Sequence, residues 1–278
     1  MIRSPLRYPG GKSKAVKFLA QFVPKDFKEF REPMFGGGSL TLYLAQLYPD
    51  RRFVGGDLNL DLYCFWKSLK EQPKELIREI RKFKENFHDG RELFNLLISA
   101  RDKKKSCLQR GAEFFVLNRI TFSGTVDSGG YSEQAFKKRF TKSSIERLEK
   151  VYPILQRIEF FHGDYAELLH KEGEKVVIYL DPPYYGNKKS RLYGKRGSLH
   201  FEFDHLRLLE EIKKTPHRVL ITYDDNEFIR ELYKDFYIVE WNLKYGMSSF
   251  TGKNKKATEL LIANFPLVKK TLISLSTA

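Results

Sequence analysis

The four consecutive residues Asp181-Pro182-Pro183-Tyr184 have the most distinctive chemistry in this chain. They follow the apolar run Val176–Leu180, which is typical of a buried strand. At the end of such a strand the Asp181 carboxylate can accept hydrogen bonds from an amino group, and the prolines fix the backbone. The Tyr184 ring can stack on a flat partner. We predict a rigid clamp for an amine on a flat ring such as a nucleobase; the alternative is a simple strand terminator.

A glycine-rich turn, Gly36-Gly37-Gly38, lies between a predicted strand and a predicted helix. Its glycines allow a tight turn and close approach of a flat ligand, beside which Phe35 could lie. Asp57 follows about 20 residues later, the spacing at which a carboxylate binds ribose hydroxyls in dinucleotide folds. The pattern differs from Gly-x-Gly-x-x-Gly, so an adenosine ligand without phosphate, S-adenosylmethionine, fits better than a dinucleotide. A purely structural turn is the alternative.

A second glycine turn, Tyr8-Pro9-Gly10-Gly11-Lys12, is followed by Ser13. Gly-Lys-Ser is how a phosphate-binding P-loop ends, but the first glycine of that motif and the strand before it are absent. We therefore expect Lys12 to contact the carboxylate of the methyl donor or a DNA phosphate, rather than a nucleoside triphosphate.

The elements that must position these residues alternate between strand and helix, which favours an α/β fold with a mostly parallel sheet. No helical pattern separates the last two strands, so we expect them to form an antiparallel hairpin at the sheet edge. The predicted strands are Glu29–Arg31, Arg52–Gly55, Arg157–Phe161, Val176–Leu180, Arg218–Tyr223, Tyr237–Lys244 and Glu259–Phe265.

The segment between the second and third strands has helical periodicity instead. Leu76, Ile77 and Ile80 recur at helical spacing after Pro73, which suits a helix start. We predict a catalytic domain formed by residues 1–66 and 146–278 and a helical insertion, residues 67–145, that recognises the target.

The composition narrows the class of partner. The chain has 278 residues, a net charge of +15 and 41% hydrophobic residues, which together indicate a folded protein with a polyanionic partner, usually nucleic acid. Cys64 and Cys107 predict neither a disulfide framework nor a zinc site. No stretch reaches the roughly 18 apolar residues of a membrane span. We expect a soluble, cytoplasmic, nucleoid-associated protein.

The motifs in their order resemble one family over nearly the whole chain. Tyr-Pro-Gly-Gly-Lys, Glu-Pro-Met-Phe-Gly-Gly-Gly-Ser, Gly-Asp-Leu-Asn, the helical insertion, His-Gly-Asp-Tyr and Asp-Pro-Pro-Tyr succeed one another as in the Dam-like (D12 class, α-class) DNA adenine-N6 methyltransferases. The resemblance implies a Rossmann-like S-adenosylmethionine-dependent methyltransferase sheet with a helical target-recognition insertion.

The resemblance also assigns roles. It implies that Asp57 binds the donor's ribose and that Asp164 recognises its adenine with Tyr165 beside it; Asp164 also suits a helix N-cap. The residues that it implies for the donor site are Tyr8, Lys12, Glu32, Phe35, Gly36, Gly37, Gly38, Asp57, Asp164, Tyr165 and Asp181. The residues that it implies for catalysis are Asp181, Pro182, Pro183 and Tyr184.

In the mechanism that follows, the enzyme extrudes an adenine from the duplex and stacks it on Tyr184. The Asp181 carboxylate and the Pro182 carbonyl each accept one N6 hydrogen, and the methyl group passes directly, leaving S-adenosylhomocysteine. No metal is needed. The alternatives are methylation of RNA adenine or cytosine N4, a catalytically silent DNA-binding module of the same fold and, more distantly, a nicotinamide-dependent oxidoreductase.

The segment Leu117–Thr125 resembles the part of the family that leads into a base-contacting hairpin. The following residues, Asp127–Phe136, depart from the GATC-specific members, which makes GATC doubtful as the site. We expect double-stranded DNA as partner, a monomer, and a cognate restriction endonuclease if the enzyme serves restriction-modification. The predicted DNA-binding residues are Arg119, Ser123, Lys137, Lys138, Arg139, Lys188, Lys189 and Lys253; a solvated basic face is the alternative for each lysine.

Overall fold

A seven-stranded sheet forms the centre of the computed structural model, which describes residues 1–126, 128–185, 203–243 and 257–268. The strand order is β3-β2-β1-β4-β5-β7-β6, with β1 to β5 parallel, and β7 antiparallel to both β5 and β6. All seven predicted strands and the antiparallel edge hairpin are confirmed. The strands are β1 (Glu29–Glu32), β2 (Arg52–Asp57), β3 (Ile158–His162), β4 (Val176–Leu180), β5 (Arg218–Asp224), β6 (Tyr237–Leu243) and β7 (Ala257–Ala263).

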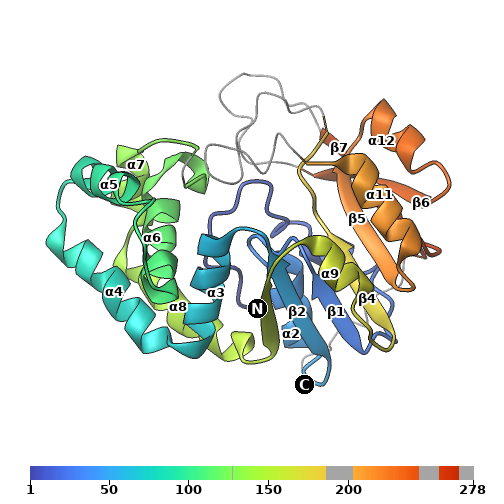
Figure 1. The fold of residues 1–278 in the computed structure, drawn as a ribbon, viewed down its shortest axis with the longest axis horizontal. Helices are drawn as coiled ribbons and strands as arrows, with labels where there is room; N and C mark the ends of the chain where they lie inside the picture. Colours follow the sequence, from blue (N-terminus) through green and yellow to red (C-terminus); the bar gives the residue numbers. More distant parts are fainter. Residues whose placement is uncertain (127, 186–202, 244–256, 269–278) are drawn as a thin grey trace.

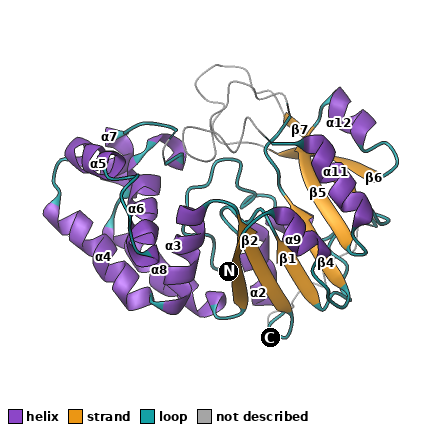
Figure 2. Cartoon of the chain, viewed as in Figure 1, coloured by secondary structure: helices purple, strands orange, loops and turns teal. Residues whose placement is uncertain are grey.

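Helices cover the sheet and extend beyond one end of it (Figure 1). In Figure 2, α9 and α11 lie in front of the sheet and α2 lies behind it, while α4 to α8 gather beside the β2–β3 end. The helices are α1 (Val16–Leu19), α2 (Ser39–Leu47), α3 (Leu60–Glu71), α4 (Pro73–Asn86), α5 (Gly90–Ser99), α6 (Cys107–Ile120), α7 (Glu133–Arg139), α8 (Lys142–Leu155), α9 (Tyr165–His170), α11 (His205–Lys214) and α12 (Glu227–Leu232), with a 3-10 turn at Phe122–Gly124.

Strand β4 shows why its sequence is apolar throughout. All five residues are buried. Val177 and Tyr179 pack into the core on one face of the sheet, whereas Val176, Ile178 and Leu180 pack into the core on the other. Because side chains alternate along a strand and helices cover both faces, every position must be apolar. The strand therefore delivers Asp181, the next residue, to the sheet edge in a fixed position.

The region between β2 and β3 is helical, as its periodicity predicts. Pro73 stands at the first turn of α4, where Leu76, Ile77 and Ile80 are buried. In the described residues between these two strands, the pairing is limited to an isolated antiparallel bridge from Thr121 to Tyr131. The same hydrophobic core continues from β1 and β2 into the insertion, so the insertion packs against the sheet.

The two cysteines are disulfide-bonded, which corrects the expectation that they would not pair. Cys64 lies on α3 and Cys107 begins α6, and their Cα atoms are 4.9 Å apart. Helices α3 and α6 pack side by side, and a Cβ on Gly111 of α6 would come within 2.8 Å of the Cys64 carbonyl oxygen. This close approach of two helix backbones, which the cysteine spacing did not reveal, brings the sulfur atoms together.

Candidate active site

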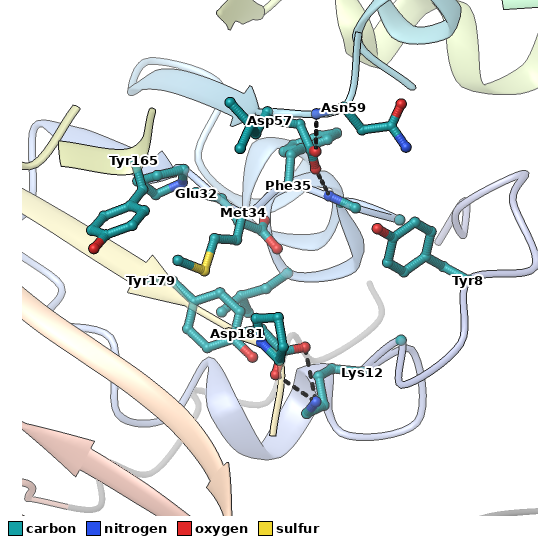
Figure 3. A pocket seen from close by; sticks show the side chains of 18 of the residues that line it. Tyr8, Lys12, Glu32, Met34, Phe35, Asp57, Asn59, Tyr165, Tyr179 and Asp181 are labelled. Carbon is teal, nitrogen blue, oxygen red and sulfur yellow. Dashed lines mark hydrogen bonds and ion pairs between the residues drawn. The ribbon is translucent and has the colours of Figure 1, made fainter. Parts of the chain in front are cut away.

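A cavity of about 290 Å³ lies at the carboxyl ends of β1, β2 and β4. The chain runs from β1 outward to β2 and β3, and then returns to place β4 on the other side of β1. Ligands of open α/β sheets bind at such a reversal of strand order. The cavity wall includes both the triple-glycine turn and Asp181, so the predicted donor site and the predicted clamp share one space (Figure 3).

The triple-glycine turn needs its glycines for both conformation and space. Gly36 and Gly38 have φ of 47° and 61°, a region that disfavours side chains. A Cβ at Gly36 would lie 2.6 Å from the ring of Tyr8, and one at Gly38 would lie 2.3 Å from the ring of Phe35. Phe35 lines the cavity but is only 2% exposed and packs edge-on against Trp66. Its ring therefore supports the turn from beneath.

Two acidic side chains hold the turn and the helix after it. Asp57 Oδ2 accepts the Gly36 N–H at 3.0 Å, and its Oδ1 accepts the Asn59 N–H at 2.9 Å. Burial raises the pKa of Asp57 to about 6. Glu32 accepts hydrogen bonds from both the N–H and the hydroxyl of Thr41, in the first turn of α2, and its own burial raises its pKa to about 8.

Asp164 has the helix-capping role that its position allows. Its carboxylate accepts the Ala166 N–H at 2.9 Å, at the start of α9. Arg207 from α11 donates two further hydrogen bonds to it, at 2.8 and 2.9 Å, and also lies over the Tyr165 ring. Burial works to raise the pKa of Asp164, but the Arg207 and Ala166 hydrogen bonds outweigh it and lower that pKa. All three side chains line the cavity.

Lys12 lies at the clamp rather than at a separate anion site. Its ammonium donates to both Asp181 oxygens, at 2.7 and 2.8 Å, and to the Gly10 carbonyl at 3.0 Å (Figure 3). The same ammonium lies 5.0 Å from the centre of the Tyr184 ring. Lys12 is 3% exposed and the Asp181 side chain is 20% exposed, so the ammonium is buried while the carboxylate stays partly open. The Lys12 nitrogen thus lies between the Asp181 carboxylate and the face of the Tyr184 ring.

The cavity thus combines a glycine-lined turn with the Asp181 carboxylate, and comparison with known proteins gives the family of the chain. A model of the D12 class N6 adenine-specific DNA methyltransferases matches residues 8–247. The chain belongs to this family. The matched residues include every motif that lines the cavity, from Tyr8 to Asp181.

Relatives of this D12-class chain extend along most of its length. The Type II methyltransferase M.MjaIII of Methanocaldococcus jannaschii is 26% identical, over 94% of this chain and 98% of that protein. The Type II methyltransferase M1.LlaDCHI of Lactococcus lactis is 24% identical, over 95% and 96% of the two chains. The DNA adenine methylase of Vibrio cholerae is 26% identical, over 84% and 85%.

Every residue that the sequence assigned to the donor site lines the cavity of the D12-class chain. Of the clamp, Asp181 and Pro183 line it, whereas Pro182 is buried and Tyr184 lies behind, beneath Lys12. Sequence reasoning missed further lining residues. Tyr179 could have been found, since it precedes Asp181 by two positions on one strand and so points the same way. The lining residues that were missed include Met34, Asn59, Tyr179, Phe203 and Arg207.

The predicted DNA-binding residues differ in how far they are exposed to solvent. Lys137, Lys138 and Arg139 are exposed in the last turn of α7. Arg119 is only 4% exposed and stacks over the Phe115 ring; burial, with three neighbouring arginines, lowers its pKa to about 9. A direct DNA contact from Arg119 therefore does not fit its burial. Lys188, Lys189 and Lys253 lie outside the described residues.

The turn after α6 presents an aromatic side chain that sequence reasoning passed over. Phe122 is 62% exposed, next to Ser123, whose φ is 53°. Val126, a β-branched residue, also has a positive φ, of 57°. Such backbone conformations persist only where the surroundings impose them, and they concentrate at functional sites. The turn is anchored because the Asn118 side chain donates to the Arg7 and Gly124 carbonyls.

Neither a metal centre nor a membrane helix is found in the part of the chain that the structure describes. Those residues contain no group of three or more His, Cys, Asp and Glu side chains placed to hold a metal ion. None of their helices is long and apolar enough to cross a bilayer.

Proposed function

We propose that this chain transfers a methyl group from S-adenosylmethionine to the N6 amine of an adenine that is flipped out of double-stranded DNA, at a specific site. The observation that supports this most directly is the single cavity, whose wall includes both the glycine turn of the donor site and the Asp181 carboxylate of the clamp. Two reactants held in one cavity meet without a diffusional step, which is a large part of what catalysis of a direct displacement requires.

The cavity suits S-adenosylmethionine by its chemistry. Asp57 has an acceptor lone pair left on each oxygen for ribose hydroxyls after its two backbone hydrogen bonds. Tyr165 offers a ring for the donor's adenine, and Arg207 lies over that ring and pairs with Asp164 beside it. The glycine turn lets the methionine arm approach the backbone. When bound, S-adenosylmethionine supplies an electrophilic methyl group; the residues named here bind and orient it.

For the acceptor, the Asp181 carboxylate and the Pro182 carbonyl each take one N6 hydrogen while Tyr184 stacks on the base. An aromatic–base stack contributes roughly 1–3 kcal/mol, comparable with the cost of extruding a base. Lys12 neutralises Asp181 electrostatically, so the carboxylate serves as a hydrogen-bond acceptor for the amine.

DNA contact is assigned to the insertion, residues 67–145, and to the basic segments 187–197 and 244–256. The exposed Lys137, Lys138 and Arg139 suit phosphates, and the exposed Phe122 suits the base stack. Ser123 adjoins Phe122 on the same turn, and Lys188, Lys189 and Lys253 complete the proposed contact set. Residues 1–66 and 146–278 form the proposed catalytic domain.

The test is methyl transfer itself. Purified protein is incubated with isotopically labelled S-adenosylmethionine and a duplex of mixed sequence, and the DNA is digested and analysed by nucleoside mass spectrometry. Labelled N6-methyladenine is expected in DNA only when protein and donor are both present. Labelled N4-methylcytosine, label in an RNA substrate alone, or donor binding without transfer would each contradict the proposal.

A cognate restriction endonuclease is a further part of the proposal, which the names of two relatives, both Type II methyltransferases, support. The proposed form of the chain is a monomer in the cytoplasm. Sequencing of modified bases in DNA from cells that express the chain gives the methylated site. A nuclease from the source genome that cuts the unmodified site and spares the modified one would support the partnership; methylation of a site that no host nuclease cuts would contradict it.

A further inference from the structure

Two buried hydroxyl groups lie behind the clamp. The Thr222 hydroxyl is 2.7 Å from Asp181 Oδ1, and the Tyr179 hydroxyl is 2.9 Å from the Thr222 hydroxyl. Thr222 is completely buried and Tyr179 is 1% exposed. On the parallel strands β4 and β5, Leu180 pairs with Ile221, so Asp181 and Thr222 are next to each other at the strand ends. The contact is therefore built into the sheet register.

The direction of these hydrogen bonds follows from the donor inventory. A carboxylate paired with an ammonium only accepts, so Thr222 must donate its single proton to Asp181. The Thr222 oxygen then accepts the proton of Tyr179. The order is thus Tyr179 to Thr222 to Asp181, and each hydroxyl of this buried row has one fixed role. Replacing Thr222 by a residue without a hydroxyl interrupts the row at its centre.

The hydroxyl groups of Tyr179 and Thr222 limit the number of free hydrogen-bond acceptor sites on Asp181. An ionised carboxylate has about four lone-pair sites. Oδ1 accepts from Thr222 and Lys12, and Oδ2 accepts from Lys12. The three donors of Lys12 are all used, on Gly10 and on the two Asp181 oxygens, so Lys12 is itself anchored. One acceptor site is left, on Oδ2.

We propose that Thr222 is a positioning residue for methyl transfer: with Tyr179 behind it, it fixes the plane of the Asp181 carboxylate so that one oxygen alone meets the acceptor amine. This inference rests on the proposed function. One open site on Asp181 takes one amine hydrogen and leaves the second for the Pro182 carbonyl. A carboxylate free to turn would present either oxygen at varying angles, and small misplacements of reacting groups slow a reaction strongly.

The experiment measures single-turnover methyl transfer to an adenine duplex, together with the Kd of S-adenosylmethionine by calorimetry and the Kd of the DNA. Thr222→Val keeps the shape of the side chain and removes its donor. We expect its rate constant to fall roughly 10- to 100-fold, as for loss of a hydrogen bond to a charged group, with both Kd values within about twofold of the unchanged protein. Tyr179→Phe should lower the rate less, because Thr222 keeps its own donor.

A second pair of variants separates positioning from packing. Thr222→Ser and Thr222→Ala leave nearly the same space and differ by one hydroxyl group. Thr222→Ser is expected to stay within about threefold of the unchanged rate, and Thr222→Ala to match Thr222→Val. Equal rates for Ser and Ala, or a Thr222→Val rate equal to that of the unchanged protein, would overturn the inference. If the unchanged protein methylates no adenine, the proposed function fails instead.

Discussion

Three carboxylic acids at or near the cavity have raised pKa values because their surroundings disfavour the charged form. Burial raises the pKa of Asp57 to about 6, of Glu259 to about 7 and of Glu32 to about 8. The nearby Lys12 lowers the pKa of Glu32 and Glu259, and Asp181 raises it, but desolvation is the largest cause for each. Each acid costs free energy once it ionises inside the folded protein. The site therefore couples protonation to stability.

Glu32→Gln tests this coupling. In the unfolded chain Glu32 ionises near its ordinary pKa of 4.5, whereas in the folded protein it stays neutral up to about pH 8. The folded state then binds the extra proton between these values, so the stabilisation is complete below pH 4.5 and lost as pH rises through 8. We expect the free energy of unfolding of Glu32→Gln to exceed that of the unchanged protein. This excess should be larger at pH 9 than at pH 5 by ~2–5 kcal/mol.

The measurement for Glu32 is urea unfolding of both proteins at several pH values. Because Asp57 and Glu259 are present in both proteins, their titration cancels in the difference. A difference that does not change with pH would mean that Glu32 ionises alike in the folded and unfolded states.

Asp181→Asn tests the clamp at its central residue. The amide keeps the shape but replaces one acceptor oxygen by a donor, so the N6 amine loses its partner and Lys12 loses its counter-charge. We expect the methyl-transfer rate to fall roughly 100-fold or more, while S-adenosylmethionine and DNA still bind.

A matched control accompanies Asp181→Asn. Unpaired Lys12 is a buried charge and would itself destabilise the fold. Asp181→Asn combined with Lys12→Met removes that charge and should recover thermal stability without recovering transfer. If transfer persists in Asp181→Asn, Asp181 is not the acceptor of the amine hydrogen.

At the scale of elements, Arg31 joins strand β1 to the end of helix α9. Its guanidinium is completely buried, pairs with Glu29 at 2.5 Å, and donates to the Leu168, Lys171 and Glu172 carbonyls at 2.6 to 2.8 Å. These carbonyls lie at the C-terminal end of α9 and just beyond it, where a helix leaves acceptors unsatisfied. Because Asp164 and Tyr165 begin α9, this contact holds one wall of the donor pocket.

Arg31→Lys should loosen that wall. An ammonium has three donors in place of a planar fork of five and cannot reach all four partners, so buried carbonyls lose their hydrogen bonds. We expect a loss of unfolding free energy of ~2–4 kcal/mol and weaker donor binding, measured by denaturation and calorimetry. The control is Arg52→Lys, because Arg52 also contacts Glu29 but is half exposed. Equal effects of the two changes would contradict a special role for Arg31.

The disulfide ties α3 to α6 across the helices α4 and α5. A link between residues 43 positions apart lowers the conformational entropy of the unfolded chain. In the chain-entropy model this raises the free energy of unfolding by ~4 kcal/mol, and measured values are commonly ~2–4 kcal/mol. Cys107→Ser should therefore lower the unfolding free energy by about this amount in protein prepared without reductant. In reductant the two proteins should differ little. If Cys107→Ser and the unchanged protein had equal free energies of unfolding both with and without reductant, the disulfide would contribute nothing to stability.

At the scale of the whole molecule, the net charge of +15 favours association with a polyanion. The helices of the insertion lie beside one end of the sheet, and α7 presents Lys137, Lys138 and Arg139 to solvent (Figure 1). Phosphate contacts by such residues release counterions, so they appear in the salt dependence of DNA binding.

Replacing all three α7 residues by Gln should weaken DNA binding and reduce the slope of log K against log salt. Each lost phosphate contact lowers that slope by about 0.9, so a reduction of up to about 3 is expected. Fluorescence anisotropy at several salt concentrations measures it. The control changes Lys213 and Lys214, which are exposed at the end of α11, towards the opposite end of the sheet from the insertion helices. An unchanged slope for the α7 variant would show that α7 does not contact phosphates.

The sequence alone determined the strands, the helical insertion and part of the pocket lining. Apolar runs reflect burial from solvent, and glycines and Asp-Pro-Pro-Tyr reflect the backbone conformation of a turn. Both depend on residues that are close in the sequence, so they can be predicted from it. The cavity and the place of Asp57 in it could therefore be predicted from the residues at strand ends, whereas Asp164 was assigned to it through the family resemblance.

Only the tertiary structure decided which side chains are partners. Lys12 pairs with Asp181 across 169 positions, Thr222 reaches the same carboxylate from the next strand, and Cys64 meets Cys107 between two helices. It also placed Arg119 in the interior, where the sequence suggested a DNA contact. Such pairings depend on strand order, register and helix packing, which arise when distant segments bury their apolar faces together.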